Sequence, residues 1–392
     1  MKKTLLTICL VWMCFSLSAQ KIIDLSGKWS FSIDRQDNGE KEKWFSHTLN
    51  DFINLPGSMP EKLKGDEVTA KTQWTGSLYD SSYYYNPYME KYRKEGNIKF
   101  PFFLTPDKHY VGAAWYQKEV NIPADWKGER ILLFLERPHI ETTVWVNGQK
   151  TGMQNSLCVP HQYDITRYVR PGKCTITIRV DNRIKEINVG PDSHSITDQT
   201  QGNWNGIVGR ICLQTTPKTY FDDIQIYPEP EQKLARVKVV IKGTGTAKVK
   251  LSAESFNTDK KHIVPAIQQE IKLNKGVTET EMVLPMGNDM LLWDEFHPAL
   301  YKLKAEVTNG KKTEIKEIQF GMRRFEIKGK WFYVNGRKTQ LRGTVENCDF
   351  PLTGYAPMDV ESWERVFRIC RSYGLNHMRF HSFCPPEAAF MA

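Results

Sequence analysis

Five polar residues near the C-terminus have the types and spacing to bind a charged or hydroxyl-rich ligand. They follow or lie in two segments with strand character, residues 332–344 and 375–383, which are apolar or β-branched and bounded by Gly, Pro and Asn. If these segments are parallel strands, their carboxyl ends meet at one edge, where β/α barrels build active sites. The candidates are Arg342, Glu346, Asn347, Arg379 and His381.

A helix should connect the two strands. Asp359 is a good N-cap, Gly374 is a good terminator, and between them apolar side chains recur at helical spacing. The pattern predicts one β-α-β unit whose connection is a right-handed crossover between parallel strands. The apolar positions are Trp363, Val366, Phe367 and Cys370.

Several of these candidates also have a purely structural interpretation. His381 lies two residues after Arg379 and therefore points to the same side of the strand, where it can donate to a sugar hydroxyl or brace a loop. Glu346 and Asn347 can bind hydroxyls or cap the loop that follows the strand. Arg342 is expected to be a buried structural charge, and Glu387 to begin a helix, where a carboxylate suits the helix dipole.

Composition indicates a folded protein of two or three domains. The chain has 392 residues, 12% aromatic residues and a formal net charge of +9 that is spread along the sequence. No run of Lys and Arg with interleaved aromatic residues is present, so nucleic-acid partners are not expected.

The first residues resemble a targeting signal. Lys2 and Lys3 precede an apolar run from Leu5 to Phe15 that is too short to span a bilayer, and the small residues 16–19 provide a cleavage site before Gln20. We expect residues 1–19 to be a signal peptide and the remaining chain to be exported, without a membrane span, to the periplasm or the extracellular space.

The cysteines of the remaining chain are widely spaced and contain no C-x-x-C pair, which argues against a zinc site. Export would permit disulfides, but a chain of this length does not need them, and free buried thiols are the favoured interpretation. No metal and no cofactor is expected. The cysteines are Cys158, Cys174, Cys212, Cys348, Cys370 and Cys384.

Residues 20–217 have an all-β pattern typical of a sandwich or jelly roll. Six alternating runs recur with turn residues between them: 28–34, 115–122, 130–136, 142–148, 175–182 and 209–214. Asn147-Gly148 predicts a hairpin because both residues tolerate a positive φ. Two long insertions, 64–109 and 183–205, interrupt the pattern. The Tyr-rich part of the first, Tyr79–Tyr92, suits either stacking on sugar rings or packing of the loop, and Trp204 is expected in the core or between domains.

Residues 218–321 predict a second β domain, for which an immunoglobulin-like sandwich fits best. Its length is about right, it contains no long helix, and it contains no Cys…Trp…Cys pattern. The expected strands are 222–227, 235–241, 247–255, 267–273, 278–284 and 303–307.

Several stretches resemble glycoside hydrolase family 2, the group of β-galactosidases, β-glucuronidases and β-mannosidases. AAWYQKEVNIP, TTVWVNGQKTG, ITIRVDN and WNGIVGRICL are similar to the family's sugar-binding domain. FGMRRFEIKGKWFYVNGRKTQLRGT resembles its passage from sandwich to barrel, and YGLNHMRFHSFCPP its second barrel strand. The chain departs from the family in two places. After the first strand, Val345 and Asn347 stand about where the family commonly has an Asn and then a His. After the second strand the family often has a His before Tyr-Pro, whereas here His381 comes earlier and Cys384-Pro385-Pro386 follows.

The resemblance implies a jelly roll, an immunoglobulin-like sandwich and, over residues 322–392, the start of a truncated (β/α)8 barrel. It also implies a retaining glycosidase with two catalytic Glu residues on later barrel strands, so both are expected beyond residue 392, and Arg379 would hydrogen-bond the nucleophile carboxylate. The chain is then expected to be the front portion of an enzyme for β-linked glycosides of plant or host glycans, and inactive alone. A non-catalytic carbohydrate-binding or scaffold protein of two sandwiches is the alternative. No oligomeric state follows from the sequence.

Overall fold

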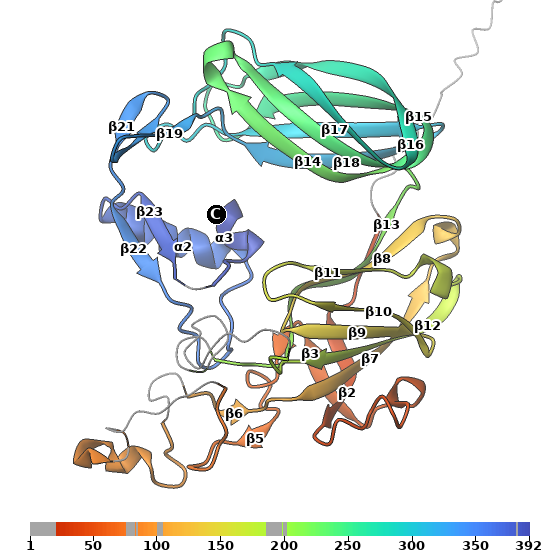
Figure 1. Ribbon diagram of the computed structural model, residues 1–392, viewed down its shortest axis with the longest axis vertical. Coiled ribbons are helices and arrows are strands. Elements are labelled where there is room, and N and C mark those ends of the chain that lie inside the picture. Colours follow the sequence, from red (N-terminus) through yellow and green to blue (C-terminus); the bar gives the residue numbers. More distant parts are fainter. Residues whose placement is uncertain are drawn as a thin grey trace, which may run out of the picture. The chain divides into compact units, whose positions relative to one another are not determined.

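The computed structural model describes residues 21–75, 83, 85–99, 105–185, 198, 202–381 and 383–392. Two compact units are present (Figure 1). One comprises Ile22–Thr216 together with Glu326–Ala392, and the other contains Pro217–Phe325. The proposed signal peptide lies outside the described residues, as do residues 79–82 and 84 of the Tyr-rich stretch. Within the described residues, no helix is long and apolar enough to cross a bilayer.

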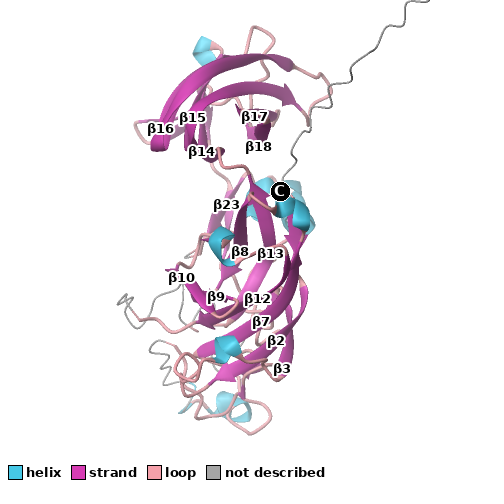
Figure 2. Ribbon diagram, turned by 90° about the vertical axis from the view of Figure 1, so that its right-hand side faces the viewer, coloured by secondary structure: helices cyan, strands magenta, loops and turns pink. Residues whose placement is uncertain are grey.

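The first unit contains an antiparallel sandwich of two sheets, whose strands dominate the view in Figure 2. The first sheet has the order β1-β13-β8-β11, with β4 paired to β13, and the second has the order β10-β9-β12-β7-β2-β3. The first sheet consists of β1 (Ile22–Asp24), β4 (Gly57–Ser58), β8 (Arg130–Pro138), β11 (His161–Asp164) and β13 (Gly206–Thr216). The second consists of β2 (Gly27–Asp34), β3 (Asp51–Leu55), β7 (Ala113–Ile122), β9 (Glu141–Val146), β10 (Gln149–Asn155) and β12 (Gly172–Asp181).

Alternating side chains of both sheets meet in one core. Ile176, Ile178 and Val180 of β12 are fully buried and belong to the same apolar cluster as Trp29 and Leu133 from neighbouring strands. All six predicted strands of this region are present. The predicted hairpin is confirmed as well, because Asn147 and Gly148 have φ of 50° and 77° between the antiparallel strands β9 and β10.

Shorter elements complete the first sandwich. The insertion 64–109 contains a two-stranded ribbon of β5 and β6 and the 3-10 helix η2. Asn86 is the N-cap of η2, because its side chain accepts a hydrogen bond from the Tyr88 N–H. The remaining 3-10 helices lie in connecting loops. The bounds are η1 (Trp44–Ser46), β5 (Asp66–Glu67), η2 (Pro87–Tyr92), β6 (Lys108–His109), η4 (Ala124–Trp126) and η5 (Thr166–Tyr168).

The second unit is a β structure with one apolar core, and it corrects the strand count expected from the sequence. The runs 235–241 and 247–255 are two parts of one long strand, as are 267–273 and 278–284, because Gly243 and Gly245 shift the register without ending the pairing. The first part of this long strand pairs with β14 and the second part with β17. The elements are β14 (Tyr220–Glu229), η6 (Pro230–Gln232), β15 (Leu234–Ser255), β16 (Ile263–Pro285), β17 (Tyr301–Asn309) and β18 (Lys312–Phe320).

The C-terminal segment also differs from its predicted strand at one point. The run 332–344 is divided by a turn at Asn335 and Gly336, whose φ values are 49° and 76°, so a hairpin precedes the parallel strand. The same Asn-Gly rule that predicted the earlier hairpin applies here. The elements are β19 (Phe325–Lys328), β20 (Trp331–Val334), β21 (Arg337–Thr339), β22 (Gly343–Glu346), α2 (Val360–Ser372), β23 (His377–Phe380) and α3 (Glu387–Met391).

The predicted β-α-β unit is present. β22 and β23 pair in parallel, and α2 lies between them in sequence. The Asp359 carboxylate accepts a hydrogen bond from the Ser362 N–H at 2.8 Å, and Gly374 has the positive φ of a helix terminator. Trp363 is 1% exposed and its ring lies 5.6 Å from that of Phe380, so the helix packs its apolar face against β23.

This unit packs on the first sandwich through named contacts. The Ser58 hydroxyl donates to the Thr353 carbonyl, the Tyr355 hydroxyl donates to Glu61 at 2.8 Å, and Arg210 forms an ion pair with Glu387. The C-terminal segment is therefore held by the sandwich although the whole second unit separates the two in sequence.

Candidate functional site

A cavity of about 410 Å³ lies between the first sandwich and the β-α-β unit. Its β-α-β wall is formed by residues of the two segments that come after β22 and after β23, so the cavity lies on the side of the carboxyl ends of these parallel strands. Its sandwich wall comes from the end of β8 and from the stretches before β11 and β13. Its lining includes Arg137, His139, Cys158, Trp204, Tyr355 and Cys384.

Aromatic stacking builds the sandwich wall. The indole of Trp204 is 5% exposed and stacks on the His139 ring, with centroids 4.6 Å apart and planes at 20°. Tyr355 from the β-α-β unit lies against the other part of the indole at 5.5 Å. A Cβ atom on Gly354 would lie 2.8 Å from the Trp204 ring, so close approach requires glycine there. The expectation that Trp204 lies in the core or between domains is confirmed.

His139 is a neutral hydrogen-bonding group in this wall. Its Nε2 lies 3.2 Å from the Oδ1 of Asn203, whose Nδ2 donates to Thr75 and to the Asn182 carbonyl, so Oδ1 is the acceptor and His139 the donor. Burial lowers the pKa of His139 to about 4. The imidazole is therefore uncharged at neutral pH.

Arg137 supplies the positive charge. Its Nη1 donates to the Cys384 carbonyl at 2.6 Å, and its Nη2 donates to the carbonyls of Pro385 at 3.2 Å and Cys158 at 3.5 Å. The guanidinium thus binds backbone carbonyls of both walls. Among the described residues, no Asp or Glu lines the cavity. This arrangement can bind and orient a polar ligand with one apolar face, but its walls contain no carboxyl group for acid–base chemistry.

The five residues singled out from the sequence lie outside this lining, on two faces of the β22–β23 pair. Met378 and Phe380 pack with Trp363, so they define the face toward α2. Arg379 and His381 alternate with them and lie on the opposite face, and Arg379 is exposed. That face would be the interior in a closed barrel. Glu346 is paired with Phe380 in the register and therefore does not share a face with Arg379.

Glu346 and Arg342 make local contacts. The Glu346 carboxylate accepts a hydrogen bond from the Cys348 N–H at 2.7 Å, which is the loop-capping geometry. The expectation of a buried charge at Arg342 is wrong, because its side chain is exposed and donates to the Gly374 carbonyl at 2.8 Å. Asn347 is exposed. Glu387 begins α3 as expected, and it pairs with Arg210.

Sequence reasoning missed Arg137, His139 and Tyr355 as wall residues. Arg137 and His139 flank Pro138 at the end of a strand that is otherwise apolar, and a basic pair at a strand end is a signal that was present in the sequence. Tyr355 lies in a loop without a periodic pattern, so nothing in the sequence indicated its contact with Trp204.

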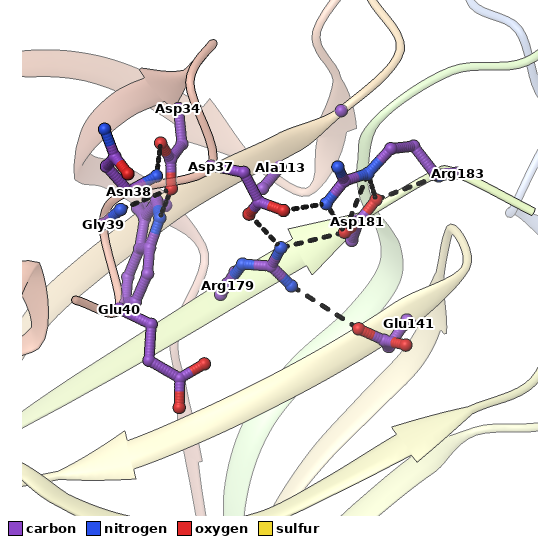
Figure 3. Close-up of polar contacts among 12 residues, drawn as sticks. Asp34, Asp37, Asn38, Gly39, Glu40, Ala113, Glu141, Arg179, Asp181 and Arg183 are labelled. Atoms are coloured by element: carbon purple, nitrogen blue, oxygen red, sulfur yellow. Dashed lines mark hydrogen bonds and ion pairs between the residues drawn. The ribbon is translucent and has the colours of Figure 1, made fainter. Parts of the chain in front are cut away.

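A second polar cluster lies on the first sandwich and ties a loop to a sheet (Figure 3). Asp181 is fully buried and accepts hydrogen bonds from Arg179 at 2.9 Å and Arg183 at 2.6 Å, and Asp37 accepts from the same two arginines. Lys185 also donates to Asp181, at 2.8 Å. Burial alone would raise the pKa of Asp181, but the bond from Arg183 and the other cations outweigh it and hold that pKa well below its usual range. Opposite charges are matched here, which is the geometry of a structural anchor.

Among the described residues, no group of three or more His, Cys, Asp or Glu side chains is placed to hold a metal ion. The six described cysteines are free thiols; Cys174, Cys212 and Cys348 are buried, whereas Cys158 is exposed and the other two are partly exposed.

The described chain thus combines an antiparallel sandwich, a second β unit and a β-α-β unit, with a cavity near the ends of the parallel strands. The chain belongs to glycosyl hydrolases family 2. Residues 22–217 match "Glycosyl hydrolases family 2, sugar binding domain", and residues 219–323 match "Glycosyl hydrolases family 2".

Relatives are longer than this chain. It is 24% identical over 355 residues to a β-glucuronidase of Paenibacillus borealis, covering 86% of this chain and 51% of that protein. A β-galactosidase of Thermoanaerobacter pseudethanolicus is 24% identical over 313 residues, covering 75% of this chain and 39% of that protein. The chain therefore spans about half the length, or less, of these curated relatives.

Among solved structures, the chain is similar to the β-glucuronidase of Ruminococcus gnavus, with a TM-score of 0.68 and 19% identity over 95% of this chain and 57% of that one. A β-glucuronidase of Bacteroides uniformis gives a TM-score of 0.68 and 16% identity, covering 95% of this chain and 41% of that one. At this identity the likeness establishes the fold.

Proposed function

We propose that this chain provides the sugar-binding front portion of a retaining β-glycosidase and that the cavity beside Trp204 holds part of the glycoside. The observation that supports this is the position of the cavity, at the carboxyl ends of β22 and β23 in a chain of glycosyl hydrolases family 2. Sugar rings have apolar C–H faces and polar rims, and the wall offers aromatic rings, a neutral imidazole and a guanidinium.

The substrate class proposed for the whole enzyme is a β-linked glucuronide or galactoside of plant or host glycans, because relatives carry these activities in their names. Double displacement needs two carboxyl groups about 5 Å apart. The cavity wall in the described residues offers none, so the two carboxylates must come from elsewhere in the enzyme. We propose that β22, α2 and β23 are the first unit of the barrel that would carry them, and that Arg379 and His381 face its interior.

Hydrolysis tests the first part. The purified 392-residue chain should hydrolyse neither aryl β-glucuronides nor aryl β-galactosides above the buffer rate. Turnover that disappears on mutation of a Glu inside this chain would refute the proposal.

Binding tests the cavity. Saturation-transfer NMR with phenyl β-glucuronide and phenyl β-galactoside should give a ligand signal that falls at least about threefold in Trp204→Ala. Tyr227→Phe is the matched control, since Tyr227 lies exposed in the second unit. An unchanged signal in Trp204→Ala would mean that the sugar binds elsewhere or only through the exposed Tyr85 and Tyr88, which would support the non-catalytic carbohydrate-binding alternative.

We also propose that the chain is exported and that residues 1–19 are removed. The charged start, short apolar run and small residues support this proposal. Expression of the full gene product with a C-terminal tag, followed by fractionation and N-terminal sequencing, should yield a chain beginning at Gln20 outside the cytoplasm. A chain that keeps Met1 in the cytoplasm would contradict it.

A further inference from the structure

Two cysteines from distant parts of the chain meet at one wall of the cavity. Cys158 lies in the loop between β10 and β11 of the first sandwich, and Cys384 follows β23 in the C-terminal segment. Both line the same cavity. They face it from the sandwich and from the β-α-β unit, and the Cys384 side chain is near enough to raise the pKa of the Cys158 thiol.

One side chain positions both cysteine backbones. Arg137 donates from Nη1 to the Cys384 carbonyl at 2.6 Å and from Nη2 to the Cys158 carbonyl at 3.5 Å, with a further bond to the Pro385 carbonyl at 3.2 Å. Because Arg137 belongs to β8, the guanidinium connects the rigid sheet to both loops. Fixing both backbones limits the conformational freedom that bond formation must remove.

The other described thiols are poorer candidates. Cys174 and Cys212 are buried within the first sandwich, and Cys370 lies on α2 and does not line the cavity. Cys348 lines the cavity but is only 6% exposed, and burial raises the pKa of its thiol to about 12. Since the thiolate is the attacking species, Cys348 should react slowly.

We propose that Cys158 and Cys384 form a reversible disulfide that fastens the C-terminal segment to the first sandwich. The oxidant is an external low-molecular-weight disulfide such as oxidised glutathione. One cysteine loses its proton and its thiolate attacks the external disulfide, whose S–S bond breaks and releases one thiolate. The second cysteine then attacks the mixed disulfide in the same way, so two cysteine thiols are oxidised and two external thiols are formed.

The link would change how the segment is held. In the reduced chain, hydrogen bonds and the exposed Arg210–Glu387 pair tie the segment to the sandwich, and such contacts open readily. A covalent bond between residues 158 and 384 would keep the two walls of the cavity together while those contacts open. Burial of the sulfur and the neighbouring Cys384 raise the pKa of Cys158, so pairing should be faster at alkaline pH.

Thiol mapping tests the proposal directly. The full chain is equilibrated at pH 8 in glutathione buffers from fully reduced to fully oxidised, free thiols are alkylated, and tryptic peptides are analysed without reduction. We expect the loss of two free thiols and one cross-linked species that joins the Cys158 and Cys384 peptides. Cys370→Ser should form the same link, and Cys158→Ser and Cys384→Ser should not.

A second readout is independent of peptide mapping. Under limited trypsin digestion, release of fragments from residues 326–392 should slow at least tenfold in the oxidised chain, and dithiothreitol should restore the rate. Cys158→Ser, a change in an exposed loop, should show no effect of oxidation. The proposal fails if excess oxidised glutathione produces no link or only glutathione mixed disulfides. It also fails if Cys348 is the partner, or if oxidation removes two free thiols from Cys158→Ser as it does from the natural chain. It does not depend on which sugar binds.

Discussion

At the scale of single residues, burial and the charges of neighbouring groups together decide whether an ionisable side chain is charged. Asp181 is fully buried yet charged because three cations surround it, whereas His139 is neutral because burial lowers its pKa more than the hydrogen bond to Asn203 raises it. Arg379 is exposed, whereas His381 is half-buried and its backbone N–H donates to the Glu346 carbonyl.

Replacing Asp181 by Asn should destabilise the first sandwich strongly. The change leaves Arg179, which is 8% exposed at its side chain, with a weaker set of partners, and breaking a buried charge network of this kind costs about 3–5 kcal/mol. Urea unfolding followed by tryptophan fluorescence measures it, because 10 of the 11 Trp residues lie outside residues 217–325. Asp223→Asn, at an exposed position of β14, is the control and should change stability by less than about 0.5 kcal/mol. A loss of similar size in both variants would contradict the anchor role.

His161 should make the first sandwich sensitive to mild acid. The residue is fully buried, its Nδ1 lies 2.6 Å from the Thr142 hydroxyl, and burial lowers its pKa from 6.5 to about 4. Between these values the unfolded chain binds a proton that the folded chain does not, so stability is complete above pH 6.5 and falls as the pH drops to 4, by about 2–3 kcal/mol.

The measurement is the free energy of unfolding in urea at several pH values between 4 and 7. His161→Gln should flatten the pH dependence by almost one proton, even if it lowers stability at every pH. His47→Gln, at an exposed position, should leave the slope unchanged. An identical slope for His161→Gln and the natural sequence would show that the destabilisation has another source.

At the scale of elements, glycine determines whether a strand bends or ends. Gly243 and Gly245 interrupt the alternation of β15 without interrupting its pairing with β16, so the strand continues through the bend. At Asn335-Gly336 two consecutive positive φ values reverse the chain and begin a hairpin. Both sites are rich in glycine, and their backbone angles decide that the strand continues at one and turns back at the other.

Gly245→Val should weaken the second unit alone. Gly245 has φ of +85°, where a β-branched residue is strained by about 1–2 kcal/mol, although no atom lies within 4 Å of its Cβ position. Hydrogen–deuterium exchange should show faster exchange in peptides from residues 220–320 and no change in residues 113–181. Thr246→Val is the control, because it places the same side chain at the next position of the strand, which is also exposed, and it should have little effect on exchange. Equal exchange in the two variants would mean that the bend tolerates a side chain.

The strands and the helix could largely be predicted because their patterns are local. Alternation predicted six strands of the first sandwich correctly, and Asp359, Trp363 and Gly374 predicted α2 with its correct face. The cavity could not be predicted in the same way, since Arg137, Trp204 and Tyr355 are spread over 218 positions of the sequence and meet only in the folded chain. Long-range contacts of this kind leave no period in the sequence. Arg342 was misjudged because its side chain is exposed and donates to the Gly374 carbonyl, a contact that the local pattern does not indicate.

At the scale of the molecule, the C-terminal segment depends on the first sandwich. A two-stranded parallel pair with one helix is not expected to be stable alone. Exposed apolar side chains are frequent in this segment, including Ile327, Val345 and Phe390. The contacts made by Tyr355, Arg137 and Trp204 therefore supply stability that the segment lacks internally.

Trp204→Ala should release this segment while leaving the sandwich folded. Trp204 contacts Gly354 and Tyr355 of the segment, and removal of a buried indole costs about 3–5 kcal/mol in cores. Under reducing conditions, limited proteolysis should cut within residues 326–392 at least about tenfold faster, a factor that corresponds to about 1.4 kcal/mol of opening free energy. Tyr88→Ala, at a position that is 85% exposed, is the control and should be cut at the natural rate. If cleavage in Trp204→Ala instead spreads evenly over residues 22–216, the indole stabilises the sandwich itself and the segment is held by its polar contacts.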